Sequence, residues 1–180
     1  MKDLLLLTIL SLTISTSAVS AQTSETTPCP NPKKLRGLCM FVSSKEEDPF
    51  PQGRFVWKYQ RKLLEAACIN VKIDSEEEIG KKIAKVWAEN ESTLICNNTK
   101  FDVANGSIIK FAVNLKFDEF LIDVTKWKVN LNKVDETDAK TVLDYVHSQI
   151  EANKGLATEP VLKRYYQMLK DAGAKHKSEL

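Results

Sequence analysis

Three kinds of residue on which chemistry often depends are scarce or scattered in this 180-residue sequence. The six glycines are dispersed, and none belongs to a glycine-rich loop that could cradle phosphate groups. The two histidines are His147, which we expect to pack on a helix, and His176, which lies in a tail where nothing would orient it, so a Ser-His-Asp triad has little support. The four cysteines contain no C-x-x-C pair, which disfavours thiol redox catalysis and close-pair zinc sites. We therefore expect no enzyme activity, no cofactor and no metal.

An excess of charge of one sign is also lacking. The chain has 26 Lys and Arg against 24 Asp and Glu, and the two signs are interleaved. This balance provides no basic block for nucleic acid or an anionic membrane. The carboxylates Asp118, Glu119 and Asp123 could form a glycosidase pair, but they are explained more simply as the solvent-facing side of a helix.

The long apolar run of the sequence lies at its start. A short polar start precedes the run from Leu4 to Ile14, and Val19 and Ala21 are small enough for signal peptidase. The run falls well short of the ~20 residues needed to span a bilayer. We expect residues 1–21 to be a signal peptide cleaved after Ala21, which leaves one domain, 22–180, of 180 − 21 = 159 residues without membrane insertion. A periplasmic location is predicted, and a eukaryotic secretory lumen is the alternative.

The cysteines all lie in the part predicted to be exported. An even number of cysteines in an exported chain indicates disulfide bonds, and four allow three pairings. Closeness in sequence and the intervening prolines and glycine favour Cys29 with Cys39, which leaves Cys68 with Cys96. Residues 22–53 would then form a loop-like strap pinned by the first pair.

Two segments with helical periodicity follow the strap. From Arg54 to Cys68 apolar residues recur at helical spacing. Asp74 or Ser75 can cap a second helix, whose acidic first turn complements the positive end of the helix dipole. We expect a leading helical hairpin over residues 54–91.

One pattern occurs twice in the second half of the chain. Ser107 and Thr141, offset by 141 − 107 = 34 residues, can each cap a helix, and apolar residues follow both at matching positions. Phe117 to Trp127 has the periodicity of a second helix, and a turn-rich loop from Lys128 to Lys140 leads into the second cap.

This order of parts resembles the ankyrin repeat, a turn plus two helices with a period of about 33 residues. The resemblance rests on Gly106-Ser107-Ile108-Ile109-x-x-Ala112 and Thr141-Val142-Leu143-Asp144, which stand where that family has its T-P-L-H-x-A run, and on the loop Val129-Asn130-Leu131-Asn132. The chain departs from the family in having no proline after either hydroxyl residue and in having Ala139 at a loop position where glycine is expected.

The resemblance implies an all-α fold of stacked antiparallel helical hairpins, a short solenoid with a disulfide-pinned N-terminal strap. Residues 92–127 would be one repeat and residues 128–175 a terminal repeat or cap. Such stacks present an extended concave surface of loop tips and inner helices that binds other proteins. The residues expected to bind a partner there, each of which could instead be an ordinary exposed polar residue, are Asn98, Lys100, Asp102, Asn105, Lys110, Asn114, Asn132, Asp135, Glu136, Asp138, Lys140, Asp144 and His147.

The expected function is protein binding. By analogy of size, compartment and lack of catalytic groups, we predict a periplasmic immunity protein that inhibits an antibacterial toxin enzyme delivered by a rival cell, for example by type VI secretion. The acidic loop tips Asp135, Glu136 and Asp138, or the side carrying Lys100 and Lys110, would enter the toxin cleft. The alternative is an ankyrin-type scaffold or chaperone that supports an exported enzyme.

Overall fold

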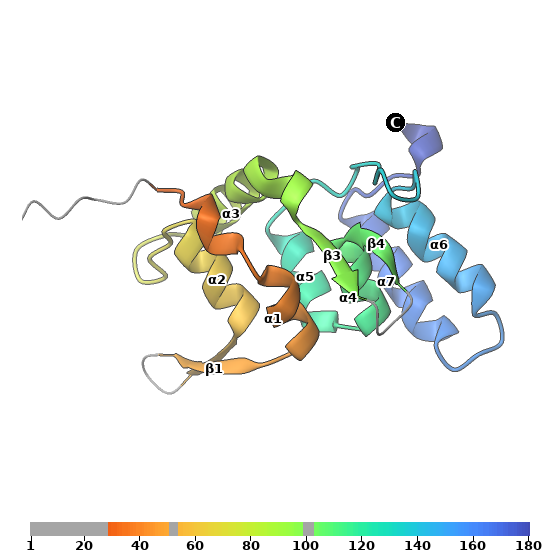
Figure 1. Ribbon diagram of the computed structural model, residues 1–180, viewed down its shortest axis with the longest axis horizontal. Coiled ribbons are helices and arrows are strands. Elements are labelled where there is room, and N and C mark those ends of the chain that lie inside the picture. The colour runs from red at the N-terminus through yellow and green to blue at the C-terminus, as the bar shows by residue number, and fades with distance from the viewer. Residues whose placement is uncertain (1–28, 51–53, 99–102) are drawn as a thin grey trace, which may run out of the picture.

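The protein is mostly helical in the computed structural model, which describes residues 29–50, 54–98 and 103–180 (Figure 1). The predicted signal peptide lies outside these residues. Within them, no helix is both long enough and apolar enough to cross a membrane. The α-helices are α1 (Leu38–Ser44), α2 (Lys58–Ala66), α3 (Glu76–Asn90), α4 (Ile108–Leu115), α5 (Asp118–Lys126), α6 (Val142–Ala152) and α7 (Glu159–Asp171). The 3₁₀ helices are η1 (Pro32–Leu35), η2 (Glu91–Thr93) and η3 (Lys177–Glu179), and the strands are β1 (Glu47–Phe50), β2 (Arg54–Trp57), β3 (Ile95–Asn98) and β4 (Val103–Ser107).

Hydroxyl side chains begin three of the helices, as the sequence predicts. Ser75 Oγ accepts the Glu78 N–H at 3.3 Å, and the Glu78 carboxylate accepts the Ser75 N–H at 2.8 Å, which is a capping box. Thr141 and Asp144 form the same reciprocal pair, with both distances 3.2 Å. Ser107 caps α4 through one first-turn N–H at 3.4 Å. These caps satisfy backbone donors that the helices leave free.

The second half of the chain contains two stacked helical hairpins. Helices α4 and α5 form one hairpin and α6 and α7 the other, and α4 packs on α6 while α5 packs on α7. The helices of both hairpins lie side by side in Figure 1. Their facing sides bury large apolar side chains, with Phe111, Phe120, Leu143 and Leu169 each at most 2% exposed. The burial of these side chains stabilises the stack by the hydrophobic effect.

The first half does not continue this stack as an equivalent repeat. Helix α1, in the segment expected to be a loop-like strap, packs on both α2 and α4. Helices α2 and α3 instead reach α5, because the rings of Tyr59 and Trp87 both lie against Phe120, at centroid distances of 5.0 and 6.3 Å. The mostly helical prediction is confirmed, whereas no solenoid is identified.

Two antiparallel hairpins depart from the all-α prediction. Strands β1 and β2 pair with Glu47 opposite Trp57, and β3 and β4 pair with Ile95 opposite Ser107. Residues 54–57 were expected to begin a helix, but the sequence Phe-Val-Trp there consists of residues that favour strands. Helix α2 therefore begins four residues later than predicted, at Lys58.

The disulfide pairing predicted from closeness in sequence is wrong. Cys29 pairs with Cys68 and Cys39 with Cys96, with Cα–Cα distances of 5.8 and 5.5 Å. Helix η1 packs on α2, and the Asn31 N–H donates to a carbonyl near the end of α2 at 2.7 Å, so Cys29 lies beside Cys68. Two disulfides are consistent with an oxidising compartment outside the cytoplasm.

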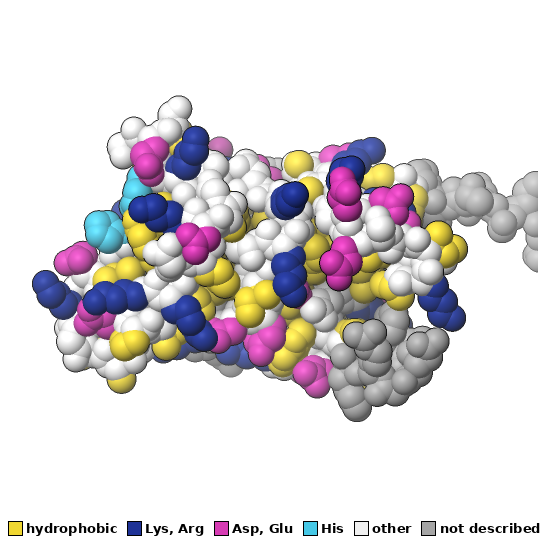
Figure 2. All heavy atoms as spheres, turned by 180° about the vertical axis from the view of Figure 1, so that it is seen from behind, with side chains coloured by type: hydrophobic (Ala, Val, Ile, Leu, Met, Phe, Trp, Pro, Cys, Tyr) yellow, Lys and Arg dark blue, Asp and Glu magenta, His cyan; other side chains and the backbone are white. Residues whose placement is uncertain are grey.

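The surface carries charges of both signs. On the face shown in Figure 2, basic and acidic side chains are interspersed, and the two histidines lie together at one end. Their ring centroids are 5.8 Å apart. This mixture agrees with the near balance of charge in the sequence.

Candidate functional site

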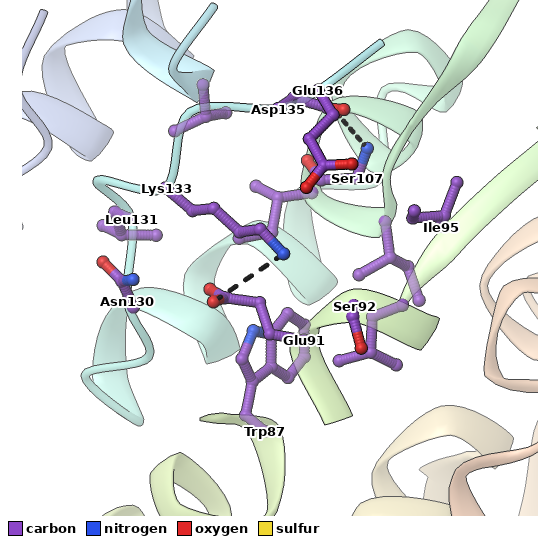
Figure 3. A pocket seen from close by; sticks show the side chains of 14 residues that line it. Trp87, Glu91, Ser92, Ile95, Ser107, Asn130, Leu131, Lys133, Asp135 and Glu136 are labelled. Carbon is purple, nitrogen blue, oxygen red and sulfur yellow. Dashed lines mark hydrogen bonds and ion pairs between the residues drawn. The ribbon is translucent and has the colours of Figure 1, made fainter. Parts of the chain in front are cut away.

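A small cavity lies against the loop 128–141, which joins α5 to α6 (Figure 3). Its volume is about 80 Å³. The walls come from the end of α3, η2, the start of β3, the start of α4 and the loop itself. The apolar side chains that line it are Trp87, Leu94, Ile108, Ile109, Leu131 and Val142.

Charged side chains surround this apolar interior. Glu91, Lys133, Asp135 and Glu136 line the cavity, so the lining carries three carboxylates and one ammonium, a formal charge of 1 − 3 = −2. Figure 3 shows Lys133 reaching across the cavity toward Glu91, where Nζ lies 3.9 Å from the carboxylate. Glu136 is exposed and makes no ion pair with any described residue. The site thus combines an apolar interior with a net negative rim.

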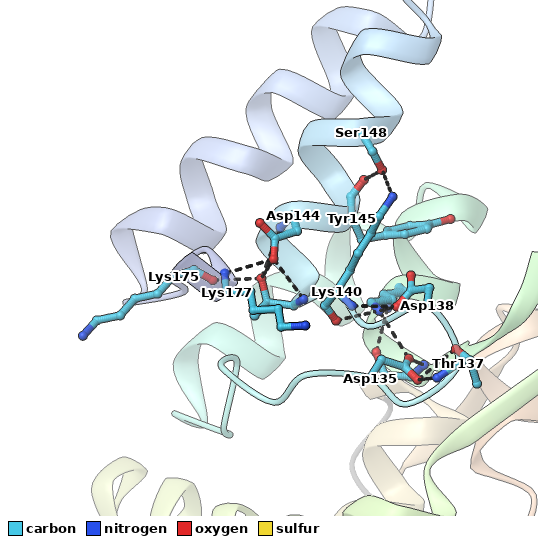
Figure 4. A network of polar contacts seen from close by, with 12 residues as sticks. Asp135, Thr137, Asp138, Lys140, Asp144, Tyr145, Ser148, Lys175 and Lys177 are labelled. Carbon is cyan, nitrogen blue, oxygen red and sulfur yellow. Dashed lines mark hydrogen bonds and ion pairs between the residues drawn. The ribbon is translucent and has the colours of Figure 1, made fainter. Parts of the chain in front are cut away.

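Asp135 fixes the position of the loop above the cavity. One carboxylate oxygen accepts the Ser107 N–H at 2.7 Å, and the other accepts the N–H and hydroxyl of Thr137 at 3.1 and 2.9 Å (Figure 4). Burial alone would raise the pKa of Asp135, but the hydrogen bonds from Thr137 and Ser107 and the ammonium of Lys110 outweigh it and lower the pKa. Asp135 is therefore charged at neutral pH and ties the loop to the start of α4.

Lys110 is the buried cation beneath the same loop. Its side chain is 3% exposed, and Nζ donates to Asp138 at 2.7 Å and to the Lys140 carbonyl at 3.0 Å. Nζ also lies 3.3 Å from Asp135 and 5.5 Å from the centre of the Tyr145 ring. A buried ammonium requires such compensation because desolvation of a charge is costly. Lys110 therefore holds the loop from inside the protein.

The tail after α7 holds the loop from its other side. The Asn132 amide donates to the Gly173 carbonyl at 3.2 Å and accepts the Lys175 N–H at 2.8 Å. The Thr141 hydroxyl lies 2.9 Å from the Lys175 carbonyl. The loop that forms the cavity rim is thus fixed at both ends.

The expectation that nothing orients His176 is wrong. Its Nδ1 lies 2.7 Å from Asp144 and its Nε2 lies 2.9 Å from the Tyr166 hydroxyl. Burial would raise the pKa of Asp144, but hydrogen bonds from His176, the Lys177 N–H and Thr141 outweigh it and lower the pKa to about 2. This cluster anchors the tail to the first turn of α6.

A second cavity of about 520 Å³ shares Leu94 and Ile95 with the first. It lies between the segment of η1 and α1 on one side and the segment of η2 and β3 on the other. Lys33 and Arg36 bring positive charge to its lining. Ile95, which is 41% exposed, therefore belongs to both an acidic and a basic cavity.

The predicted partner-binding residues differ in how far the structure describes them and in how deeply they are buried. Lys100 and Asp102 lie outside the described residues, and for Asn98 in β3 and Asn105 in β4 only the backbone is described. Lys110 and Asp135 are buried, whereas Glu136 and His147 are exposed. The half-buried residues are Asn114, Asn132, Asp138, Lys140 and Asp144. Partner binding by the whole set remains a prediction.

The structure brings part of this set together and leaves another part separate. The polar contacts around the loop involve six of the set: Lys110, Asn132, Asp135, Asp138, Lys140 and Asp144. Asn114 accepts the Tyr145 hydroxyl at 2.7 Å, away from the cavity lining. The sequence interpretation missed Trp87, Glu91 and Lys133, because residues of α3 and of the loop approach each other only through tertiary packing.

Two of the three carboxylates considered for a glycosidase pair, Asp118 and Asp123, join helices. Asp118 accepts the Arg164 guanidinium of α7 at 2.5 Å and also accepts the Tyr165 hydroxyl. Asp123 accepts the Tyr59 hydroxyl and the Gln60 amide of α2 at 2.7 and 2.6 Å. Both carboxylates therefore have a packing role.

Comparisons with family models, curated proteins and solved structures gave no match for this chain. Among the described residues, no group of three or more His, Cys, Asp and Glu side chains could hold a metal ion. The geometry of the cavity and its loop is therefore the basis for a functional proposal.

Proposed function

We propose that this chain is an exported protein-binding module that acts as an immunity protein, inhibiting an antibacterial toxin enzyme. The observation that carries the proposal is the cavity of about 80 Å³ with an apolar interior and charged rim. Small-molecule sites usually measure about 300–1,000 Å³, so this cavity is too small for a drug-sized ligand. The size suits one side chain projecting from a protein.

The scaffold supports this role because the rim is held rigidly. Asp135, Lys110 and the contact of Thr141 with the tail fix the loop through half-buried hydrogen bonds. A preorganised surface loses less conformational freedom on binding, which improves affinity. Two disulfides suit a protein that works in an oxidising compartment, where a toxin from a rival cell would arrive.

The binding face in this proposal is centred on the cavity. Exposed Ser92, Ile95 and Glu136 line it and are accessible to a partner. The β3–β4 hairpin contributes Ile95 and Ser107 to the cavity lining, and Asn98 and Asn105 stay in the proposed partner-binding set. The stacked hairpins α4–α5 and α6–α7 would be an ankyrin-like support for it.

The test is capture of a partner by the oxidised protein comprising residues 22–180, followed by an activity measurement. Envelope and culture-medium fractions of the source organism and of its competitors are the sources of partners. We expect recovery of an envelope-attacking enzyme that loses activity on binding. Recovery of an enzyme that stays active would contradict the immunity role and support the scaffold alternative.

A further inference from the structure

One basic side chain of this chain, Lys133, lines the cavity. Lys133 leaves the loop and directs its ammonium across the cavity toward Glu91 (Figure 3). The distance of 3.9 Å is too long for a hydrogen bond, so the contact is a loose ion pair. The two side chains are 36% and 24% exposed, and pairs of this kind contribute about 0–1 kcal/mol. Lys133 is therefore held weakly and can be displaced.

The cavity has more negative charge than Lys133 neutralises. Asp135 is compensated by Lys110 at 3.3 Å, whereas Glu136 has no ion-pair partner among the described residues. Glu91 has only the loose contact. A second cation at this rim could form charge-assisted hydrogen bonds with Glu91 and Glu136, whose carboxylates are not fully paired.

The interior and rim together fit one type of side chain. Lysine and arginine have an apolar stem and a charged head, and they bury the stem while the head stays at the polar edge. Leu131, Ile108 and Val142 provide the apolar wall for such a stem, and Glu91 and Glu136 lie at the rim for the head. Arginine suits this arrangement best because its guanidinium can donate to two carboxylate oxygens at once.

We propose that the cavity receives an arginine or lysine side chain from the protein partner, and that Lys133 is an internal stand-in which the incoming side chain displaces. This inference rests on the proposed function for its biological setting. It states the chemistry of the partner: a basic residue on a loop that projects into the acidic rim.

The test uses n-butylguanidinium as the probe and n-butylurea as its neutral control of similar shape. Binding to the full mature protein is followed by the NMR shift of the Trp87 indole N–H, which lines the cavity. In Lys133→Met we expect millimolar binding of the cation, about twofold tighter than in the wild type, because the loose internal ion pair that competes with it contributes little. Lys133→Gln serves as a second variant if the first is poorly folded.

Two results would overturn the inference. Equal binding of the urea and the guanidinium would mean that the carboxylates do not select a cation, and the occupant would be an apolar side chain. No shift of the indole signal by either probe in Lys133→Met and Lys133→Gln would mean that the cavity does not open. We also expect that Glu91→Gln with Glu136→Gln, added to Lys133→Met, removes the preference for the guanidinium.

This experiment needs no partner protein, so its failure is distinct from that of the proposed function. Guanidinium binding without any inhibited enzyme would preserve the cation site and contradict the immunity role. Inhibition of an enzyme without guanidinium selectivity would preserve the immunity role and contradict the basic occupant.

Discussion

Lys110 illustrates how one buried residue sets the shape of the candidate site. Its ammonium lies among Asp135, Asp138 and the Lys140 carbonyl, so the position of the loop depends on a charge that solvent does not reach. Removal of one member of a buried ionic group is costly because the others are left unpaired. The loop around the cavity therefore depends on Lys110 more than on any contact at its exposed rim.

We predict that Lys110→Met lowers the free energy of unfolding by about 3 kcal/mol, because Asp135 and Asp138 lose their cation. Urea denaturation at neutral pH measures this change. The matched control is Lys133→Met, which removes the loose pair with Glu91 and should cost at most about 0.5 kcal/mol. Similar losses of unfolding free energy in both variants would show that the loop does not depend on Lys110 more than on Lys133.

Ala139 has a left-handed backbone conformation, which is unfavourable for alanine. Its φ is +55°, in the left-handed region where glycine is favoured. We predict that Ala139→Gly raises the thermal midpoint, with a gain of about 0.5–1 kcal/mol. Ala88→Gly, at an exposed position inside α3, should lose about as much. A loss of stability in both variants would contradict the claim that the backbone at Ala139 is strained.

The tail after α7 contacts both α6 and the loop 128–141 and holds them together. Its His176 and Lys177 contact Asp144, and its Lys175 contacts both Asn132 and Thr141. Only His176 was expected to lack a partner that orients it. Its anchoring depends on ionised Asp144, which makes this part of the fold sensitive to acid.

The pH dependence of that anchor follows from the lowered pKa of Asp144, about 2 in the folded protein. Since the folded value lies below the unfolded value near ~3.9, the stabilisation is present above about pH 4 and is lost as pH falls through about 2. We predict that Asp144→Asn costs about 1–2 kcal/mol at neutral pH and that the difference from wild type shrinks to a few tenths of a kcal/mol, roughly 0.4, near pH 2. Denaturation at a series of pH values measures it.

The control for this prediction is Glu151→Gln, an exposed residue on the same helix. It should change stability little at any pH. A constant difference between wild type and Asp144→Asn from neutral to acidic pH would contradict the link to ionisation of Asp144.

The sequence predicts the helices and their caps better than it predicts which elements pack against one another. The caps at Ser75, Ser107 and Thr141 and the helix α5 are local features, and the structure has them where the pattern places them. The β1–β2 hairpin was missed because the periodicity of α2 was extended backward over Arg54–Trp57.

The candidate site was predicted in part. The acidic loop was found because turn residues and carboxylates cluster there in the sequence. Lys110 was assigned to an exposed face, since a lysine in an apolar helix gives no sign of the two aspartates that bury it. Glu91 and Lys133 are 133 − 91 = 42 residues apart in the sequence, so no local sequence pattern predicts their contact.

The two disulfides join the N-terminal segment of the described chain to two distant segments, the end of α2 and strand β3. One links Cys29, three residues before η1, to Cys68, two residues after the end of α2, and the other links α1 to β3. Each spans a long stretch of chain, with sequence separations of 39 and 57 residues. Cross-links of this length remove much of the freedom of the unfolded chain.

We predict that Cys39→Ser with Cys96→Ser lowers the free energy of unfolding by about 4 kcal/mol, the chain-entropy value for a loop of this length. Chemical denaturation of the oxidised proteins measures it. Peptide mapping without reduction should recover Cys29 linked to Cys68 and Cys39 linked to Cys96 in the wild type. Recovery of Cys29 linked to Cys39 would contradict the arrangement of η1, α1 and α2.

The most direct test of the central claim is inhibition of the captured enzyme by wild type, Glu136→Lys and Glu151→Lys. Both variants reverse one exposed charge, but Glu151 lies near the far end of α6, about 13 Å along the helix from the cavity wall at Val142. We predict that Glu136→Lys weakens inhibition at least about tenfold while Glu151→Lys leaves it unchanged. Equal inhibition by all three proteins would contradict a binding face centred on the cavity.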